Sequence, residues 1–201
     1  DKLPTNLVVY RTSINKTKQR KNEIPMPAWS EDFGVSKIRT RQKKPVVSFC
    51  GAITHPVRYS CIERLKVSGN LKTSFIIRSA FWGGNPHGEN LRKEYKSNMK
   101  SSDLVLCCRG AGNFSFRLYE TLSCGKVPII LDTDIALPCN DVINWDRFII
   151  TTPENIVSDI KQWWENMDDN KYAEVQRYSR SIYEKYLSPA GFAQYISNSL
   201  K

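Results

Sequence analysis

The alternation of short apolar runs with helical patterns constrains the fold of this chain more than any other feature of its sequence. Apolar runs of strand length occupy residues 46–50, 73–77, 104–108, 127–131 and 148–150. Between and after these runs, the spacing of apolar residues favours helices at residues 56–67, 90–100, 114–124, 154–167, 170–187 and 190–200. Strands that are apolar almost throughout are typical of a parallel sheet covered on both faces. We therefore predict an α/β fold, a Rossmann-like parallel sheet with helices on both faces and right-handed crossovers.

The amino-terminal residues have a different character from the rest of the chain. We predict that residues 1–44 form an irregular basic segment or linker and that residues 45–201 form one domain. Residues 7–10 can form a short strand, whereas the prolines within 24–29 are expected to break any regular element. Basic runs at 11–21 and 37–44 are interpreted as a solvated linker, the alternative being an arm that tracks phosphates. Because the chain starts at Asp1 and no signal sequence is visible, we expect a fragment or a processed product.

The net charge indicates an anionic partner. The chain has 30 basic and 20 acidic residues, a formal charge of +10. Nucleic acid, an acidic glycan, a phosphorylated ligand and a membrane surface all fit such a charge. Nucleic-acid binding stays an alternative, but it is not expected, because no known module is present and the aromatic residues do not alternate with basic ones. No run of 18 apolar residues occurs, so we expect membrane contact only through an anchor outside this chain.

Metal binding is not expected from the cysteines, histidines and acidic residues. The six cysteines form no C-x-x-C pair, and His55 and His87 do not have zinc-finger spacing. We predict buried free thiols, with one or two disulfides as the alternative for a secreted chain. Asp132 and Asp134 spell D-x-D after a predicted strand, and we interpret this spelling as a turn.

The strongest local signal lies in residues 104–120, where a strand leads through two glycines into a helix. Gly110 and Gly112 let the backbone approach a ligand, and the first N–H groups of the helix favour a phosphate or diphosphate. Arg117 can hold diphosphate oxygens, and Glu120 can accept from ribose hydroxyls. Alternatively, these two side chains pair with each other, and the glycines form only a turn. The segment is not a P-loop, and Ser115 stands where a dinucleotide-binding motif has its third glycine.

Parallel sheets bind ligands beyond the carboxyl ends of their strands. This rule selects four loops, after Cys50, Trp82, Cys108 and Leu131. His87 lies in the second of these loops and is our candidate for proton transfer, with His55 as a weaker one. Asp141 can line a cleft or cap a helix, and this choice stays open. Trp145 is expected in the core.

Three blocks of the sequence, in order, resemble the exostosin family of glycosyltransferases. Residues 115–120 read S-F-R-L-Y-E, residues 125–131 read G-K-V-P-I-I-L, and residues 137–145 read L-P-C-N-D-V-I-N-W. The family pattern is S-x-R-x-x-E-A, then G/A-x-x-P-V-I, then L-P-F-x-x-x-I-x-W. Upstream, Gly51 with Arg58 is similar to the family's first glycine loop and nearby arginine. Tyr95, Met99, Ser102 and residues 103–107 are similar to its Y-x-x-x-(L/M)-x-x-S-x-F-C-L segment, so the resemblance covers about residues 45–186.

The resemblance implies a two-lobed transferase of the GT-B type, of which this chain is the carboxyl-terminal half. Residues 45–201 then form the donor-binding lobe, and residues 1–44 come from an absent or reduced acceptor lobe. The implied reaction transfers a hexosyl or pentosyl group, with inversion, from a nucleotide sugar that is usually UDP-linked. The acceptor is a glycan or glycoprotein, and no metal or other cofactor is required. The implied donor-binding residues are Gly51, Arg58, Arg109, Gly110, Gly112, Ser115, Arg117 and Glu120.

The sequence departs from the family pattern at three positions. Arg109 stands where the family commonly has proline, Cys139 where it has phenylalanine, and Thr121 where it has alanine. Arg109 can add a diphosphate contact or lie on the surface. A lobe that only binds a nucleotide or glycan without catalysis is the second alternative. Family members commonly reside in the Golgi, which implies a secretory-pathway lumen; without that pattern a cytoplasmic location stays open, as does the oligomeric state.

Overall fold

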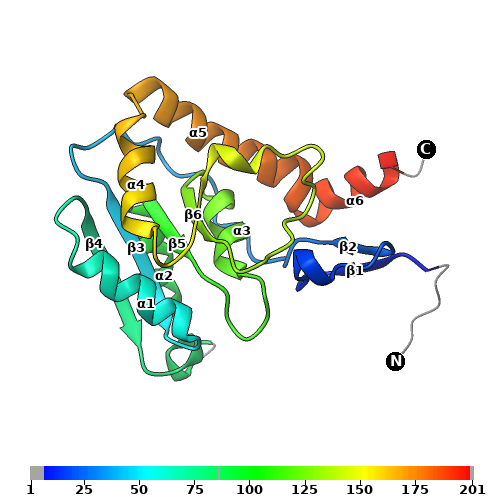
Figure 1. Cartoon of the computed structure of the whole chain (residues 1–201), viewed down its shortest axis with the longest axis horizontal. Coiled ribbons are helices and arrows are strands. Elements are labelled where there is room, and N and C mark those ends of the chain that lie inside the picture. Colours follow the sequence, from blue (N-terminus) through cyan, green and yellow to red (C-terminus); the bar gives the residue numbers. More distant parts are fainter. Residues whose placement is uncertain (1–6, 86, 200–201) are drawn as a thin grey trace.

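A parallel sheet of five strands forms the centre of the computed structural model, which describes residues 7–85 and 87–199 (Figure 1). The strands are β3 (Val46–Ala52), β4 (Lys72–Arg78), β5 (Leu104–Cys107), β6 (Val127–Leu131) and β7 (Ile149–Thr151). Their order is β4-β3-β5-β6-β7, and every neighbouring pair is parallel. Each of the five predicted apolar runs forms one of these strands, which confirms the predicted sheet.

Helices cover both faces of the sheet, as predicted. On one face α1 (Pro56–Lys66) contacts α4 (Ile156–Glu165). On the other face lie α2 (Glu89–Lys100), α3 (Phe116–Ser123) and α5 (Asp169–Ile182), and α3 contacts α5 (Figure 1). A π-helical turn, η4 (Tyr183–Leu187), extends α5 and leads into α6 (Pro189–Ser199). Three short 3-10 turns complete the fold: η1 (Lys16–Lys18), η2 (Phe81–Gly84) and η3 (Trp145–Arg147).

Helix α3 is the most deeply buried helix of the fold, with seven of its eight residues buried. It begins at Phe116, two residues later than predicted, because Ser115 is extended at the N-cap, with φ −140° and ψ 116°. It ends where predicted: Cys124 is the C-cap, and Gly125 follows with φ +66°, a conformation that glycine adopts without strain. The helix therefore presents its amino end to whatever lies beyond the carboxyl ends of the strands.

The strand order places a switch point between β3 and β5. From β3 the chain crosses to β4 on one side and then returns through α2 to β5 on the other side. The connections that leave the carboxyl ends of β3 and β5 therefore diverge, and open α/β sheets bind ligands in such a crevice.

A separate two-stranded parallel ribbon lies beside the main sheet in the amino-terminal segment. It consists of β1 (Val9–Arg11) and β2 (Glu23–Pro25). The prediction that residues 24–29 break any regular element is wrong for Ile24 and Pro25, which belong to β2. Pro25 is the last residue of its strand, a position that tolerates a residue without an N–H group.

Residues 26–44, which we call the strap, are bonded to helices on both faces of the sheet. Phe33 is buried, and its backbone N–H donates to Ser123 Oγ over 3.1 Å. Arg39 exchanges two hydrogen bonds with the Gln176 side chain, each 2.9 Å long. Arg41 donates to the Trp164 carbonyl from both Nε and Nη2. Residues 37–44 form no helix or strand and six of the eight are exposed, as expected of a solvated segment, but hydrogen bonds of Arg39 and Arg41 also hold this run against α5 and α4. Its origin in an acceptor lobe stays a prediction.

Several smaller predictions can be compared with the structure directly. All six cysteines are free and buried, as predicted, and Trp145 is in the core. Asp132 and Asp134 form the predicted turn, in which the Asp134 N–H donates to Asp132 Oδ1. In residues 7–85 and 87–199 no group of three or more His, Cys, Asp or Glu residues could hold a metal ion. None of the helices in this described part is long and apolar enough to cross a membrane.

Lys126, at the start of β6, is an unusual core residue because its side chain is only 1% exposed. Its Nζ has no hydrogen-bond partner in the described part of the chain, although the Arg39–Asp103 ion pair is close enough to act on its charge. Burial, and after it the positive charge of Arg39, lowers the pKa of Lys126 from 10.5 to about 8. The charged form of this lysine therefore destabilises the folded state.

Replacing Lys126 by methionine is expected to stabilise the fold, and the gain depends on pH. Between pH 8 and 10.5 the unfolded chain binds a proton that the folded chain does not, so the stability of the unmutated chain rises with pH relative to Lys126→Met. The gain is on the order of 3 kcal/mol at pH 7 and decreases as the pH rises through this interval. Urea unfolding at pH 7, 8, 9 and 10 measures it, with Lys93→Met, an exposed position, as the control. An equal gain at pH 7 and pH 10 would contradict this assignment.

Candidate functional site

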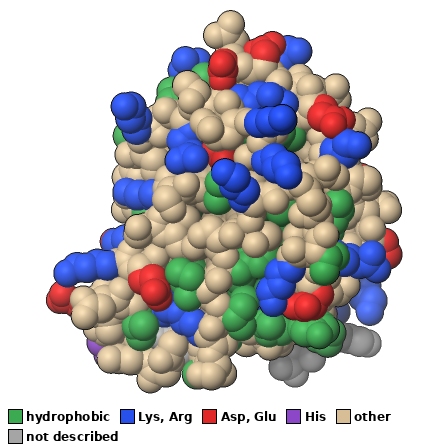
Figure 2. Space-filling view, turned by 90° about the vertical axis from the view of Figure 1, so that its left-hand side faces the viewer, with side chains coloured by type: hydrophobic (Ala, Val, Ile, Leu, Met, Phe, Trp, Pro, Cys, Tyr) green, Lys and Arg blue, Asp and Glu red, His purple; other side chains and the backbone are tan. Residues whose placement is uncertain are grey.

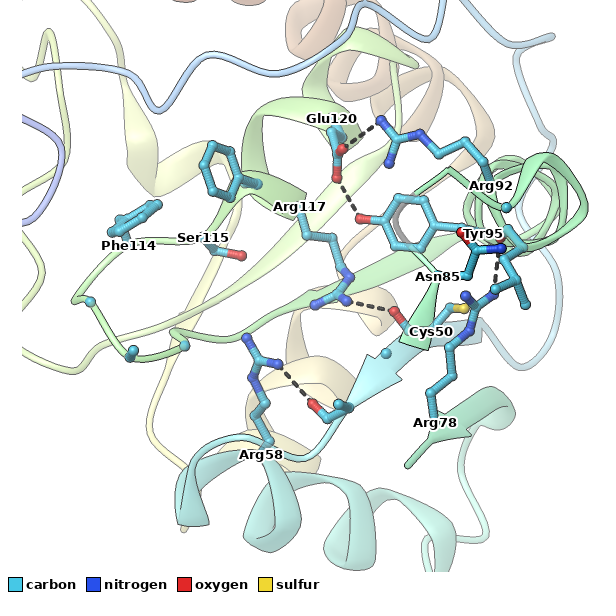
Figure 3. Close-up of a pocket in the computed structure, with 18 residues that line it drawn as sticks. Cys50, Arg58, Arg78, Asn85, Arg92, Tyr95, Phe114, Ser115, Arg117 and Glu120 are labelled. Atoms are coloured by element: carbon cyan, nitrogen blue, oxygen red, sulfur yellow. Dashed lines mark hydrogen bonds and ion pairs between the residues drawn. The ribbon is translucent and has the colours of Figure 1, made fainter. Parts of the chain in front are cut away.

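A cleft of about 350 Å³ opens at the carboxyl ends of β3 and β5 (Figure 3). Its walls come from the end of β3, the start of α1, the end of β4, α2, the glycine loop 110–112 and the start of α3. Three of the four loops selected from the sequence contribute to it. The loop after Leu131 does not line the cleft.

Arg117, in the first turn of α3, occupies the middle of this cleft (Figure 3). It is 9% exposed, and its Nη2 donates to the Cys50 carbonyl at the end of β3 over 2.6 Å. The guanidinium carbon lies 4.4 Å from the ring centroid of Phe49, and the buried Nε has no hydrogen-bond partner in the described structure. The guanidinium is thus held by one carbonyl and an aromatic face, with donor capacity left for a ligand.

Arg58, in the first turn of α1, joins the two diverging connections. Its Nη1 donates to the Ala52 carbonyl and its Nε to the Arg109 carbonyl, each over 2.8 Å. The residue is 8% exposed. Burial, and after it the charge of Arg117, lowers the pKa of Arg58. A guanidinium nevertheless stays protonated in proteins, so two positive charges face each other here.

Neither of these buried arginines has a carboxylate partner. No ion pair of Arg58 or Arg117 occurs within the described residues. In contrast, Arg78 pairs with Glu94 over 2.8 Å, and Arg92 pairs with Glu120 over 3.2 Å. Buried charges are normally paired. The Arg58–Arg117 end of the cleft therefore carries positive charge that an anionic ligand can neutralise.

Among the residues that the structure describes, Glu120 supplies the one carboxylate that lines the cleft, and it does not pair with Arg117. Its side chain is almost fully buried, its Oε1 accepts from Arg92, and its Oε2 accepts from the Tyr95 hydroxyl. The alternative in which Arg117 and Glu120 simply pair with each other is therefore wrong. The cleft instead has a cationic end and an oriented carboxylate, one turn of helix apart (Figure 3).

Glycines allow the backbone to approach these side chains closely. A Cβ at Gly51 would lie 2.9 Å from Arg117 Nη2, and one at Gly110 would lie 3.3 Å from Arg58 Nη2. At Gly112 a Cβ would lie 2.6 Å from the Phe114 ring, which would force that ring to move. Ser115 is the N-cap of α3, but its hydroxyl makes no capping bond and lines the cleft (Figure 3).

Asn113, which directly follows the glycine loop and is 2% exposed, fixes this loop on the side away from the cleft. Its backbone N–H donates to Ser13 Oγ over 2.9 Å. Its side chain donates to the Thr133 carbonyl and accepts from Thr133 Oγ1. The loop after β6 therefore supports the cleft without lining it, and residue 13 fixes the same loop from the amino-terminal segment.

Seven of the nine residues assigned to a site from the sequence line the cleft: Gly51, Arg58, Gly110, Gly112, Ser115, Arg117 and Glu120. The Arg109 side chain does not line it and donates to the Ala111 carbonyl over 3.3 Å. His87 is exposed and lies outside the lining, so its role in proton transfer stays a prediction. His55 is the N-cap of α1, where its Nδ1 accepts from the Val57 N–H. Asp141 accepts from the Tyr195 hydroxyl and does not line the cleft.

Five polar or aromatic residues of the cleft have no role in the sequence analysis: Arg78, Asn85, Arg92, Phe114 and Phe116. Tyr95 has only a place in the family pattern. The available signal was the spacing of Arg92 and Tyr95, three residues apart on the helix after a glycine-rich loop, because such residues share a helix face.

The chain is similar to known glycosyltransferases in sequence and in fold. Over 96 residues it is 29% identical to the exostosin-1 homolog of Caenorhabditis elegans, a match that covers 48% of this chain and 25% of the relative. Over 95 residues it is 30% identical to human ribitol-5-phosphate xylosyltransferase 1, a match that covers 47% of this chain and 21% of that protein. The fold is similar to that of a mutant of S. aureus TarM, with a TM-score of 0.54 at 13% identity over 90% of this chain and 40% of TarM. That TarM structure was solved in complex with fondaparinux, alpha-GlcNAc-glycerol and UDP.

The five-stranded parallel sheet with helices on both faces is Rossmann-like, and its fold is shared with glycosyltransferases of the GT-B type. The model of the exostosin GT47 domain matches residues 4–167, so the chain belongs to the exostosin GT47 family of glycosyltransferases. The matched part spans a quarter or less of each of these two relatives.

Adding a methyl group at Gly51 is expected to displace the Arg117 guanidinium, because the new Cβ would lie 2.9 Å from Nη2. We expect Gly51→Ala to lower the free energy of unfolding by about 1–3 kcal/mol, because the new Cβ crowds Arg117 and because φ at Gly51 is +156°, a conformation that residues with a side chain rarely adopt. Urea denaturation measures the loss. Gly69→Ala is the matched control, since nothing lies within 4 Å of a Cβ there. Equal stability of the two variants would contradict both the contact with Arg117 and the strained backbone at Gly51.

Proposed function

We propose that this chain is the donor-binding lobe of a glycosyltransferase that uses a nucleotide sugar, with UDP as the nucleotide. The observation that carries the proposal is the pair of buried arginines, Arg58 and Arg117, without carboxylate partners at the switch point. A diphosphate supplies the negative charge that these two guanidinium groups lack. Family membership and the fold support the proposal, and the superposed TarM structure was solved with UDP.

In the proposed complex the diphosphate lies between the two arginines and the amino end of α3. Arg117, the Ser115 hydroxyl and the first N–H groups of α3 donate to its oxygens, and Arg58 adds charge from the other side. A hydrogen bond to a charged group contributes about 1.5–3 kcal/mol. Glu120 accepts from the ribose hydroxyls. These groups supply the positive charge that stabilises a leaving diphosphate, and for this reason we propose that no metal is required.

The proposed reaction is an inverting transfer to a glycan or glycoprotein acceptor. The acceptor hydroxyl attacks the anomeric carbon from the face opposite the diphosphate, while a general base removes its proton. The bond between the anomeric carbon and the diphosphate oxygen breaks, and Arg58 and Arg117 stabilise the charge that develops on that oxygen. His87 remains our candidate for the base. Its exposed position places it toward solvent, from where an acceptor would approach.

The names of the relatives leave the class of sugar open, because one is a xylosyltransferase and the other an exostosin homolog. We therefore propose a hexosyl or pentosyl transfer without choosing between them. From the family we also propose the Golgi lumen as the compartment. Fluorescence microscopy of the tagged full-length protein tests this location.

Lys and Arg side chains also gather away from the cleft (Figure 2), and the nucleic-acid alternative depends on them. Lys and Arg side chains cluster in the upper part of the face shown in Figure 2. Near the amino ends of β3 and β4, a second hollow of about 200 Å³ is lined by Arg41, Lys43, Lys44 and Lys161. Arg41 and Lys44 are held there by backbone carbonyls.

Calorimetric titration of UDP without metal tests the proposal. We expect millimolar or tighter binding and a loss of at least about 1.5 kcal/mol in Arg117→Met, because one charged hydrogen-bonding partner is removed. Arg177→Met, which changes an exposed arginine on α5, is the control and should bind normally. A titration with GDP measures the selectivity for the nucleobase. UDP-glucuronate, UDP-N-acetylglucosamine, UDP-galactose and UDP-xylose then identify the sugar.

Two outcomes would contradict the proposal in different ways. If neither UDP nor GDP binds at millimolar concentration, and nucleic acid binds with a steep salt dependence, the basic face is the functional one. If UDP binds but the full-length protein transfers no sugar, the chain is a binding lobe without catalysis.

A further inference from the structure

The way in which Glu120 is held has a chemical consequence for the nucleoside. Its carboxylate is 3% exposed, and each oxygen accepts one hydrogen bond, from Arg92 on one side and from Tyr95 on the other. A carboxylate oxygen has two lone pairs in its plane, so each oxygen keeps one for a further donor. Two fixed acceptors on one carboxylate match two hydroxyls on adjacent carbons, such as the 2′ and 3′ hydroxyls of ribose.

Arg92 and Tyr95 contribute differently to this arrangement. Arg92 also pairs with Glu31 over 3.2 Å, so its charge is shared between two carboxylates. The Tyr95 hydroxyl donates to Glu120, and its ring packs edge-on against Phe33 with centroids 6.0 Å apart. Burial raises the pKa of Tyr95 well above its usual value, so the hydroxyl keeps its proton and remains a donor.

Tyr95 also contacts the cationic end of the cleft. The guanidinium carbon of Arg117 lies 5.6 Å from the centroid of the Tyr95 ring. The hydroxyl of this same tyrosine donates to Glu120 (Figure 3). The ring thus supports the group assigned to the diphosphate, and the hydroxyl orients the group assigned to the ribose. Removing only the hydroxyl separates these two roles, because phenylalanine keeps the ring.

We propose that Tyr95 is a positioning residue that sets the selectivity for ribose over 2′-deoxyribose nucleotides by fixing the orientation of the Glu120 carboxylate. The inference rests on the proposed function, because it takes Glu120 as the acceptor of the ribose hydroxyls. Without the Tyr95 hydroxyl, Oε2 loses its buried donor and the carboxylate can rotate about its last side-chain bond. The 2′ hydroxyl then no longer meets a fixed acceptor, while the diphosphate contacts stay in place.

Titrations of the protein with UDP, 2′-deoxy-UDP and inorganic pyrophosphate test this inference. We expect the unmutated protein to bind UDP at least about tenfold more tightly than 2′-deoxy-UDP, the effect of one hydrogen bond to a charged group. In Tyr95→Phe this ratio should fall below about threefold, with the affinity for pyrophosphate unchanged. Tyr172→Phe is the matched control: it removes another buried tyrosine hydroxyl, bonded to the Asp103 carbonyl outside the cleft, and should keep the ratio.

The outcomes separate this inference from the proposed function. Absence of binding of both UDP and pyrophosphate to the unmutated protein would overturn both. Tight UDP binding with the same ratio in Tyr95→Phe would overturn the role of Tyr95 alone. An equal loss of UDP and pyrophosphate binding in Tyr95→Phe would also overturn it, because Tyr95 would then support the cleft as a whole. If Tyr95→Phe loses the preference for UDP over 2′-deoxy-UDP but still binds pyrophosphate normally, the role of Tyr95 is supported.

Discussion

The hydrogen bonds of Arg58 to the Ala52 and Arg109 carbonyls are the interaction on which the site depends. These carbonyls belong to the connections that leave β3 and β5, which diverge at the switch point of the sheet. One guanidinium spans the gap because it has five donors in a planar arrangement. Arg58 thereby links the ends of two neighbouring strands at the edge of the cleft and brings a buried positive charge beside that of Arg117.

The positive charge at one end of the cleft results from the unequal pairing of its arginines with carboxylates. Arg78 and Arg92 have carboxylates, whereas the two arginines nearest to the glycine loop have only carbonyls and aromatic rings. Burial makes an uncompensated charge costly, and a bound anion removes that cost. Lys126 is a contrasting case: it is also buried and has no hydrogen-bond partner among the described residues, but it lies outside the cleft. An unpaired cation therefore points to a ligand only where a cavity gives the ligand access.

The amino-terminal residues show where reasoning from local sequence fails. Basic and proline-rich stretches resemble a linker when they are considered alone, yet Phe33 is in the core and Arg39 and Arg41 are bonded to α5 and α4. Their partners, Gln176 and Trp164, come more than 120 residues later in the chain. No local pattern announces such bonds, because each partner on its own is an ordinary helical residue.

The five strands, the helices on both faces and most of the residues that line the cleft, including Arg117 and Glu120, could be predicted from the sequence alone. Periodic burial and the spacing of glycines, arginine and glutamate are local properties, and they can be recognised one segment at a time. Two features follow from the folded chain and not from any local pattern: Glu120 bonds to Tyr95 and Arg92 instead of Arg117, and the Arg109 side chain does not line the cleft. Which side chains meet depends on how α2, α3 and the ends of β3 and β5 pack together, and packing joins residues that the sequence separates.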